Sequence, residues 1–366
     1  MHRTPGALAA GIFFVLPSVG VLLGLSWAYA AWGAVPAVRG IVDGFKPVVL
    51  AIVVEAVVKI SRRALLRPVH WVIAAASFVA IAGLHVPFPL IVVVAALVGV
   101  IGVRLSPDGF GAAGSGSQVA PTDDAVLPDT APAPAHTRPS VGRAARVLAV
   151  AIACWGVPLL ALIAWRGWGS LLAALYRFFT VAAFVTFGGA YSVLAYVTQA
   201  AVHQFGWLTS AQAMDGLALA ETTPGPLIMV LQFVGFMAGW QRPEGLAPLT
   251  SAVVAGLVTT WATFLPSFVF ILLGGPYVER LRSNEGMRVA LTALTAAVVG
   301  VVLHLAMQFG SAAVWSLGFD HWPNALSLAG AVAAYLALSR WKIDVPWVVL
   351  AGGVAGFAAG TLPCGR

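Results

Sequence analysis

The chain has 366 residues, of which 60% are hydrophobic and only 9% are charged. Because a soluble domain carries about 25% charged residues, this composition excludes a soluble globular protein and predicts an all-α polytopic membrane protein. The formal net charge is +7, but the basic residues form no stripe interleaved with aromatic ones, so we expect no nucleic-acid partner. The two cysteines, Cys154 and Cys364, suggest neither a disulfide framework nor a metal cluster.

The first block, residues 1–104, contains four apolar segments of about the length needed to cross a bilayer, near 7–32, 45–61, 69–85 and 88–104. The first segment is too long for the apolar region of a cleavable signal peptide. The positive-inside rule places one loop and the end of the fourth segment in the cytoplasm, because these carry Arg62, Arg63, Arg67 and Arg104.

Residues 105–146 are rich in Pro, Ala, Gly, Ser, Thr and Asp. Such a stretch cannot bury enough apolar surface to offset the entropy lost on ordering, so we interpret it as a disordered cytoplasmic linker. The second half, residues 147–366, contains further predicted spans near 147–165, 249–274, 288–309, 323–339 and 344–361. Between them we expect shorter helices near 170–186, 203–221 and 226–240.

A weak internal repeat relates the two halves. Leu16-Pro17-Ser18 followed by Leu22-Leu23-Gly24 recurs as Leu265-Pro266-Ser267 followed by Leu272-Leu273-Gly274. Internal symmetry of this kind marks transporter folds. The loop at 275–288 carries arginines and is predicted to be cytoplasmic, whereas its counterpart at 33–45 is predicted to be external. The halves are therefore expected to be inverted repeats.

Two helix breaks lie inside apolar sequence of the second half, at Thr186-Phe187-Gly188-Gly189-Ala190-Tyr191 and at Glu221-Thr222-Thr223-Pro224-Gly225-Pro226. Gly-Gly and Pro-Gly-Pro interrupt helices. In a bilayer, the backbone groups left without partners are tolerated only where they are buried in protein or line a wet cavity. Paired breaks therefore predict a substrate path.

These strings resemble the chromate transporter (CHR) family of bacterial membrane proteins. The resemblance extends through Gly206-Trp207-Leu208-Thr209, Asp215-Gly216-Leu217, Gln232-Phe233-Val234-Gly235-Phe236, and Gly274, Pro276, Tyr277, Glu279, Arg280 and Leu281. In the first half it is carried by Phe14-Val15-Leu16-Pro17 and by Lys46-Pro47-Val48-Val49-Leu50-Ala51-Ile52-Val53. It implies export of chromate, a sulfate-like tetrahedral dianion, and chromate resistance.

Long members of that family carry the two break motifs in each half. Here the first set would fall before Met1, so we expect residues 1–104 to be a partial first repeat, truncated or internally started. This expectation motivates an alternative function, that of a non-transporting remnant or a subunit that depends on a partner.

An oxyanion site at the breaks would use helix N-termini, which supply free N–H groups and a positive dipole end. Pro226 is predicted at a first helical position, with Thr222 or Thr223 near the cap and the N–H groups of Leu227 and Ile228 free. Gly188 and Gly189 would start a second half-helix, and Tyr191 and Ser192 would add hydroxyl groups. We include Phe187, Pro224 and Gly225 in this substrate-binding set. The alternative is that the breaks are kinks packed against neighbouring helices.

Glu221 precedes the second break inside an apolar run. Ionisable residues in membranes are costly and often functional, and a carboxyl removed from water tends to keep its proton, so Glu221 is a candidate proton carrier. The alternative is a carboxylate bound to the backbone at the break. Asp215, on a more polar segment, is expected on a solvated face.

Other polar residues are expected to have structural roles. Arg177 could draw anions inward or extend to the interface, and Glu55 and Lys59 would pair within one helix. Lys46 is expected to be an interface anchor, and His304 a hydrogen-bonded core residue. Three glycine pairs have spacing that permits close helix packing, namely Gly20 with Gly24, Gly235 with Gly239, and Gly352 with Gly356.

We therefore predict a secondary transporter that exports chromate from the cytoplasm, or, as another alternative, one for sulfate or another oxyanion. No Walker-type motif, zinc-protease motif or nucleophile elbow occurs, so we expect no ATP use, no enzymatic activity, no catalytic residues, no metal and no cofactor. The expected partners are the oxyanion, a proton as coupling ion, the lipid bilayer and a second copy in a homodimer. The expected location is the bacterial inner membrane.

Overall fold

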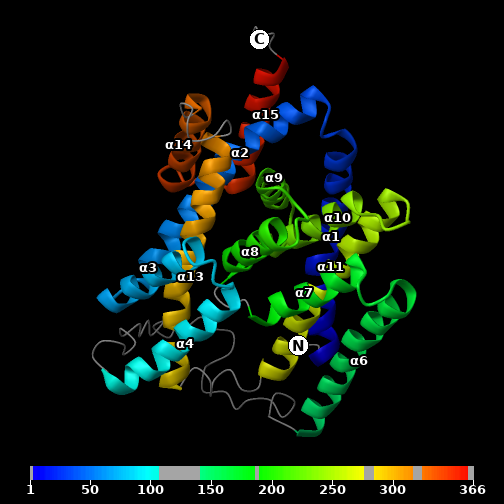
Figure 1. Ribbon diagram of the computed structural model, residues 1–366, viewed down its shortest axis with the longest axis vertical. Coiled ribbons are helices and arrows are strands. Elements are labelled where there is room, and N and C mark those ends of the chain that lie inside the picture. The colour runs from blue at the N-terminus through cyan, green and yellow to red at the C-terminus, as the bar shows by residue number, and fades with distance from the viewer. Residues whose placement is uncertain (1–2, 107–140, 186–188, 276–283, 316–323, 362–366) are drawn as a thin grey trace.

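A computed structural model describes residues 3–106, 141–185, 189–275, 284–315 and 324–361, and these residues form helices and no strand (Figure 1). The first half contains α1 (Arg3–Trp32), α2 (Pro36–Ala64), α3 (Pro68–Ala82) and α4 (Phe88–Leu105). The second half begins with α6 (Val141–Arg166), α7 (Leu171–Val185), α8 (Ala190–Gln199), the π turn η2 (Ala200–Gln204) and α9 (Ser210–Glu221). It continues with the 3₁₀ turn η3 (Leu227–Met229), α10 (Val230–Gln241), α11 (Pro248–Gly274), α13 (Glu285–Val314), α14 (Ala325–Ser339) and α15 (Val345–Thr361).

Five of the described helices are long and apolar enough to cross a membrane, namely Gly6–Trp32, Phe88–Leu105, Val141–Arg166, Pro248–Gly274 and Gly286–Val314. Shorter apolar helices occupy Pro68–Ala82, Leu171–Val185, Leu227–Gln241, Ala325–Ser339 and Val345–Ala359. This confirms the prediction of an all-α polytopic membrane protein.

Some predicted boundaries were wrong. The span predicted at 45–61 is part of α2, which already begins at Pro36, so most of the predicted external loop at 33–45 is helical. Pro36 supplies the reason, because proline is favoured at the first position of a helix. Most of the predicted linker, 107–140, lies outside the described residues, as do Arg280 and Arg282. Helix α6 already begins at Val141.

The two halves exchange their packing partners. Helix α2 of the first half packs against α14 and α15 of the second, whereas α13 of the second half packs against α3 and α4 of the first. Helices α1 and α11 cross in opposite directions, because Gly11 faces Phe268 and Leu23 faces Gly256. This is the arrangement expected of two inverted halves, and we propose that division of the chain.

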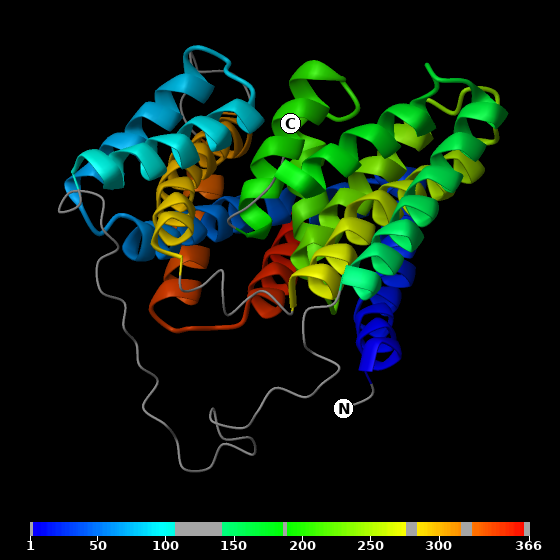
Figure 2. The ribbon, with the colours of Figure 1, turned by 90° about the horizontal axis from the view of Figure 1, so that it is seen from below.

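Helices α8 and α9 lie between two groups of helices (Figures 1 and 2). One group contains α2, α3, α4 and α13 to α15, and the other contains α1, α6, α7, α10 and α11. Helix α9 contacts α2, α13 and α15 on one side and α1 and α10 on the other. The segment between the two predicted helix breaks is therefore the centre of the molecule.

Candidate functional site: two helix breaks against helix α1

The first break separates α7 from α8. Helix α7 ends at Val185, close to the predicted position, and Phe187 and Gly188 lie outside the described residues. Gly189 has a φ of +105°, a conformation that favours glycine, and α8 starts at the next residue. The Ser192 hydroxyl donates to the Gly189 carbonyl at 2.7 Å. Ser192 therefore contributes to holding the start of α8.

The second break separates α9 from α10, and its caps differ from our prediction. Thr222 and Thr223 donate their hydroxyls to the carbonyls of Leu219 and Ala220, at 2.8 and 2.7 Å, so they close the end of α9 rather than begin the next helix. Pro226 has an extended conformation and precedes the first helical residue. Among the described residues, the N–H groups of Leu227 and Ile228 have no hydrogen-bond partner.

Helix α1 holds the second break in place. The Ser18 hydroxyl, which is fully buried, donates to the Pro224 carbonyl. Gly225 has a φ of +136°, and a side chain there would overlap that same hydroxyl. In the first turn of α10, the Gln232 amide donates to the Val19 carbonyl at 3.0 Å. The break is therefore docked on α1 by two hydrogen bonds and one glycine contact.

The two breaks meet through their side chains. The Tyr191 hydroxyl, near the start of α8, donates to Glu221 Oε1 at 3.3 Å, and α8 also contacts η3. Gly189, Pro224 and Gly225 are exposed, while Tyr191 and Glu221 are half-buried. Glu221 thus has a side-chain partner, whereas the backbone partner considered as an alternative is not found among the described residues.

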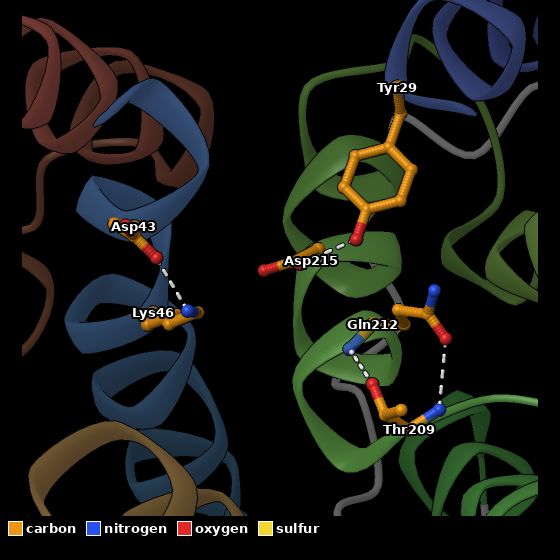
Figure 3. A network of polar contacts seen from close by, with 6 residues as sticks. All are labelled: Tyr29, Asp43, Lys46, Thr209, Gln212 and Asp215. Atoms are coloured by element: carbon orange, nitrogen blue, oxygen red, sulfur yellow. Dashed lines mark hydrogen bonds and ion pairs between the residues drawn. The ribbon is translucent and has the colours of Figure 1, made fainter. Parts of the chain in front are cut away.

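Asp215 does not lie on a solvated face, so that prediction was wrong. It is only 4% exposed, and its Oδ2 accepts a hydrogen bond of 2.8 Å from the Tyr29 hydroxyl of α1 (Figure 3). Tertiary packing explains the difference, since α1, α2 and α10 all pack against α9 and contribute residues around Asp215. The available signal was an ionisable residue between Met214 and Gly216 in an otherwise apolar run.

The predictions for the other polar residues had different outcomes. Arg177 bonds the carbonyls of Ala173 and Trp168, at 3.1 and 3.2 Å, and lies over the Trp168 ring, so it acts structurally. Glu55 and Lys59 form the predicted pair at 2.7 Å. Lys46 lies inside α2 rather than at its start, and it pairs with Asp43 at 2.5 Å. No group of three potential metal ligands occurs within the described ranges.

The predicted glycine contacts are confirmed for two of the three pairs. Gly235 and Gly239 of α10 lie against α11, and Gly352 and Gly356 of α15 lie against α2. Gly20 and Gly24 have open space where a side chain would be, so neither makes a close helix contact among the described residues.

Comparison with known proteins identifies the family of the chain. A family profile described as "Chromate transporter" matches residues 1–100 and 173–357. A chromate transport protein of Pseudomonas aeruginosa is 30% identical over 358 residues, covering 96% of this chain and 74% of the relative. A chromate transport protein of Cupriavidus metallidurans is 24% identical over 98% of this chain and 76% of the relative.

A probable chromate transport protein of Synechococcus elongatus is 27% identical over 55% of this chain and 47% of the relative. No solved structure matches the chain. The chain is a multi-pass membrane protein, which in a bacterium places it in the inner membrane, and it belongs to the chromate transporter family.

Proposed function

We propose that this protein is a secondary transporter that exports chromate from the cytoplasm and so confers chromate resistance. The observation that carries the proposal is the contact between the two helix breaks, where two half-helices begin beside each other. Two relatives that match nearly the whole chain are named as chromate transport proteins. No ATP-binding motif occurs in the sequence, so an ion gradient is the proposed energy source.

The breaks supply groups suited to a tetrahedral dianion. The N–H groups of Leu227 and Ile228, at the start of the helix that continues as α10, are free of protein partners among the described residues. Helix N-termini favour anions through these groups and through the helix dipole. Tyr191 adds a hydroxyl, and the exposure of Pro224 and Gly225 leaves access to the break.

Glu221 is the proposed site of ion coupling at the substrate. It is half-buried beside the break, and its partner is the neutral hydroxyl of Tyr191 rather than a cation. Because no cation holds the carboxyl in its charged form, a carboxyl in such surroundings can bind and release a proton. Its negative charge would repel a bound dianion, so proton occupancy and substrate occupancy are linked at this position.

The test is chromate uptake into inside-out vesicles, because export from a cell corresponds to accumulation in such vesicles. We expect uptake by the parent chain and a loss of about tenfold or more, equivalent to about 1.4 kcal/mol, in Pro226→Ala and Glu221→Gln. Pro248→Ala and Asp344→Asn are matched controls, since Pro248 starts α11 and Asp344 is exposed. Equal loss in the controls would argue against a site at the breaks.

Two alternative functions make different predictions in the same assay. A non-transporting remnant or a partner-dependent subunit would show no uptake although the protein is present in the membrane. A carrier of sulfate or another oxyanion would take up labelled sulfate as well as chromate, because backbone donors discriminate poorly between tetrahedral dianions. Competition by excess sulfate therefore separates the two substrate classes.

A further inference from the structure

A second polar site lies away from the Tyr191–Glu221 contact, in a cavity of about 440 Å³ among α1, α2, α9 and α10 (Figure 3). Its polar lining includes Tyr29, Arg39, Asp43, Lys46, Gln212 and Asp215. The Asp43 side chain is 51% exposed, so the cavity reaches the surface. A cavity with this lining is suited to water and ions rather than to an apolar ligand.

Asp215 lines this cavity, and one of its two carboxyl oxygens is unpaired in the described part of the chain. Its Oδ2 accepts from Tyr29, but Oδ1 is buried and has no hydrogen-bond partner among the described residues. In Figure 3 one carboxyl oxygen of Asp215 points away from the Tyr29 hydroxyl, towards the side where the α2 residues Asp43 and Lys46 lie. A buried, unpaired carboxylate oxygen is costly, and binding a proton there removes the charge that makes it so.

A proton fits this site better than a metal cation does. Gln212 Oε1 is already engaged, because it accepts from the Thr209 N–H at 3.0 Å and from Gln241 at 3.3 Å. Asp43 is paired with Lys46. The cations Arg39 and Lys46 also line the cavity and would repel a metal ion. A proton needs only the one free oxygen of Asp215.

The charged residues around the cavity are compatible with both the ionised and the protonated form of Asp215. Helix α2 contributes Arg39, Asp43 and Lys46, α1 contributes only the Tyr29 hydroxyl, and α10 contributes the uncharged Trp240 and Gln241. Helices α13 and α15 and the turn η3 also pack on α9 but contribute no residue to the cavity lining among the described ranges. With Asp215 ionised the lining charges cancel, and with Asp215 protonated one positive charge remains in a cavity that reaches the surface.

Helix α9 therefore carries two carboxyls, each bound by a tyrosine. Asp215 is bound by Tyr29 of α1, and Glu221 is bound by Tyr191 of α8. The six-residue separation corresponds to a rise of about 9 Å along the helix. We propose that Asp215 is an exchangeable proton site that loads from this cavity and supplies the proton coupled to transport. The inference rests on the proposed function for its role, but the proton site itself can be tested without substrate.

The direct test is infrared difference spectroscopy of the full chain in lipid vesicles during a pH titration. We expect the carbonyl band of a protonated carboxylic acid to decrease as the pH rises. That band should be smaller in Asp215→Asn, where Glu221 can still contribute to it, and should keep its size in Asp344→Asn, an exposed carboxyl changed in the same way. A band of equal size in Asp215→Asn, or one that does not titrate in the parent, would overturn the proposal.

Tyr29→Phe gives a second test that keeps a carboxyl at the site. The Tyr29 hydroxyl donates to the ionised form of Asp215, so its removal should move the midpoint of the titration to higher pH. An unchanged midpoint would show that the titrating group is not Asp215. This variant also serves if Asp215→Asn does not fold.

The role in coupling is tested with labelled chromate in reconstituted vesicles. Asp215→Asn should retain chromate exchange at equal pH on both sides but lose accumulation driven by a pH gradient. Accumulation that persists in the variant, or that follows a sodium gradient at equal pH, would overturn the coupling role. If the parent moves no chromate at all, the proposed function fails, whereas the infrared titration still decides whether Asp215 is a proton site.

Discussion

The same Leu-Pro-Ser sequence occurs once in each half of the chain, and its two serines lie in different surroundings. Ser18 of α1 is fully buried and donates to the Pro224 carbonyl, whereas Ser267 of α11 is exposed. The difference shows that the serine of this motif binds the backbone of a helix break where such a break lies next to it. Helix α1, which contains Pro17, presents a buried hydroxyl, and the broken chain of the other half docks on it.

The largest effect that would test this comparison is expected for Gly225→Ala. The new methyl group would require a strained backbone at φ +136° and would overlap the Ser18 hydroxyl. Strain of this kind costs about 1–3 kcal/mol before the overlap is added. Chromate uptake and the melting temperature in detergent should both fall.

Gly245→Ala is the control, because Gly245 also has a positive φ, +85°, but has open space around it. A Gly225→Ala protein no less stable than the control would mean that the break does not depend on its contact with α1.

A somewhat smaller effect is expected where α2 of the first half crosses α15 of the second. A side chain at Gly44 would overlap the Gly352 carbonyl and approach Gly356 Cα to 2.9 Å. Overpacking of this kind costs about 1–3 kcal/mol, so Gly44→Ala should lower the melting temperature.

Gly20→Ala should leave the melting temperature nearly unchanged, since that position has open space. Comparable losses in both variants would contradict the view that the exchanged helix pairs hold the two halves together.

Ser18→Ala should have a moderate effect, close to the net value of one hydrogen bond, about 1 kcal/mol. It leaves the Pro224 carbonyl without its donor, and we expect reduced chromate uptake as well as reduced stability. Ser267→Ala, the matched change in the other half, should alter neither measurement. Equal effects of the two substitutions would show that the buried hydroxyl is not what distinguishes the halves.

These contrasts also explain how much could be predicted from sequence. The ends of α7 and α9 were predicted closely because Gly-Gly and Pro-Gly-Pro act on their own backbone. The docking of Pro224 on Ser18 could not be predicted, since it joins segments 206 residues apart. The burial of Asp215 was missed for the same reason, because its covering residues come from other helices.

The smallest effect is expected for the ion pair of α2. Lys59→Gln removes the partner of Glu55, but the Lys59 side chain is 69% exposed, and such i, i+4 pairs contribute only about 0.3–0.5 kcal/mol. In α13, which packs against α2, the ring of His304 faces Phe78, and Gln308 bonds His203 at 3.0 Å. Helix α2 thus uses an ion pair, whereas these α13 side chains use a ring contact and a hydrogen bond. Added salt should reduce the effect of Lys59→Gln on the melting temperature, because salt screens an exposed ion pair, but it should not reduce that of Gln308→Ala. A large, salt-independent effect of Lys59→Gln would instead show that Glu55 depends on its partner to remain charged in the core.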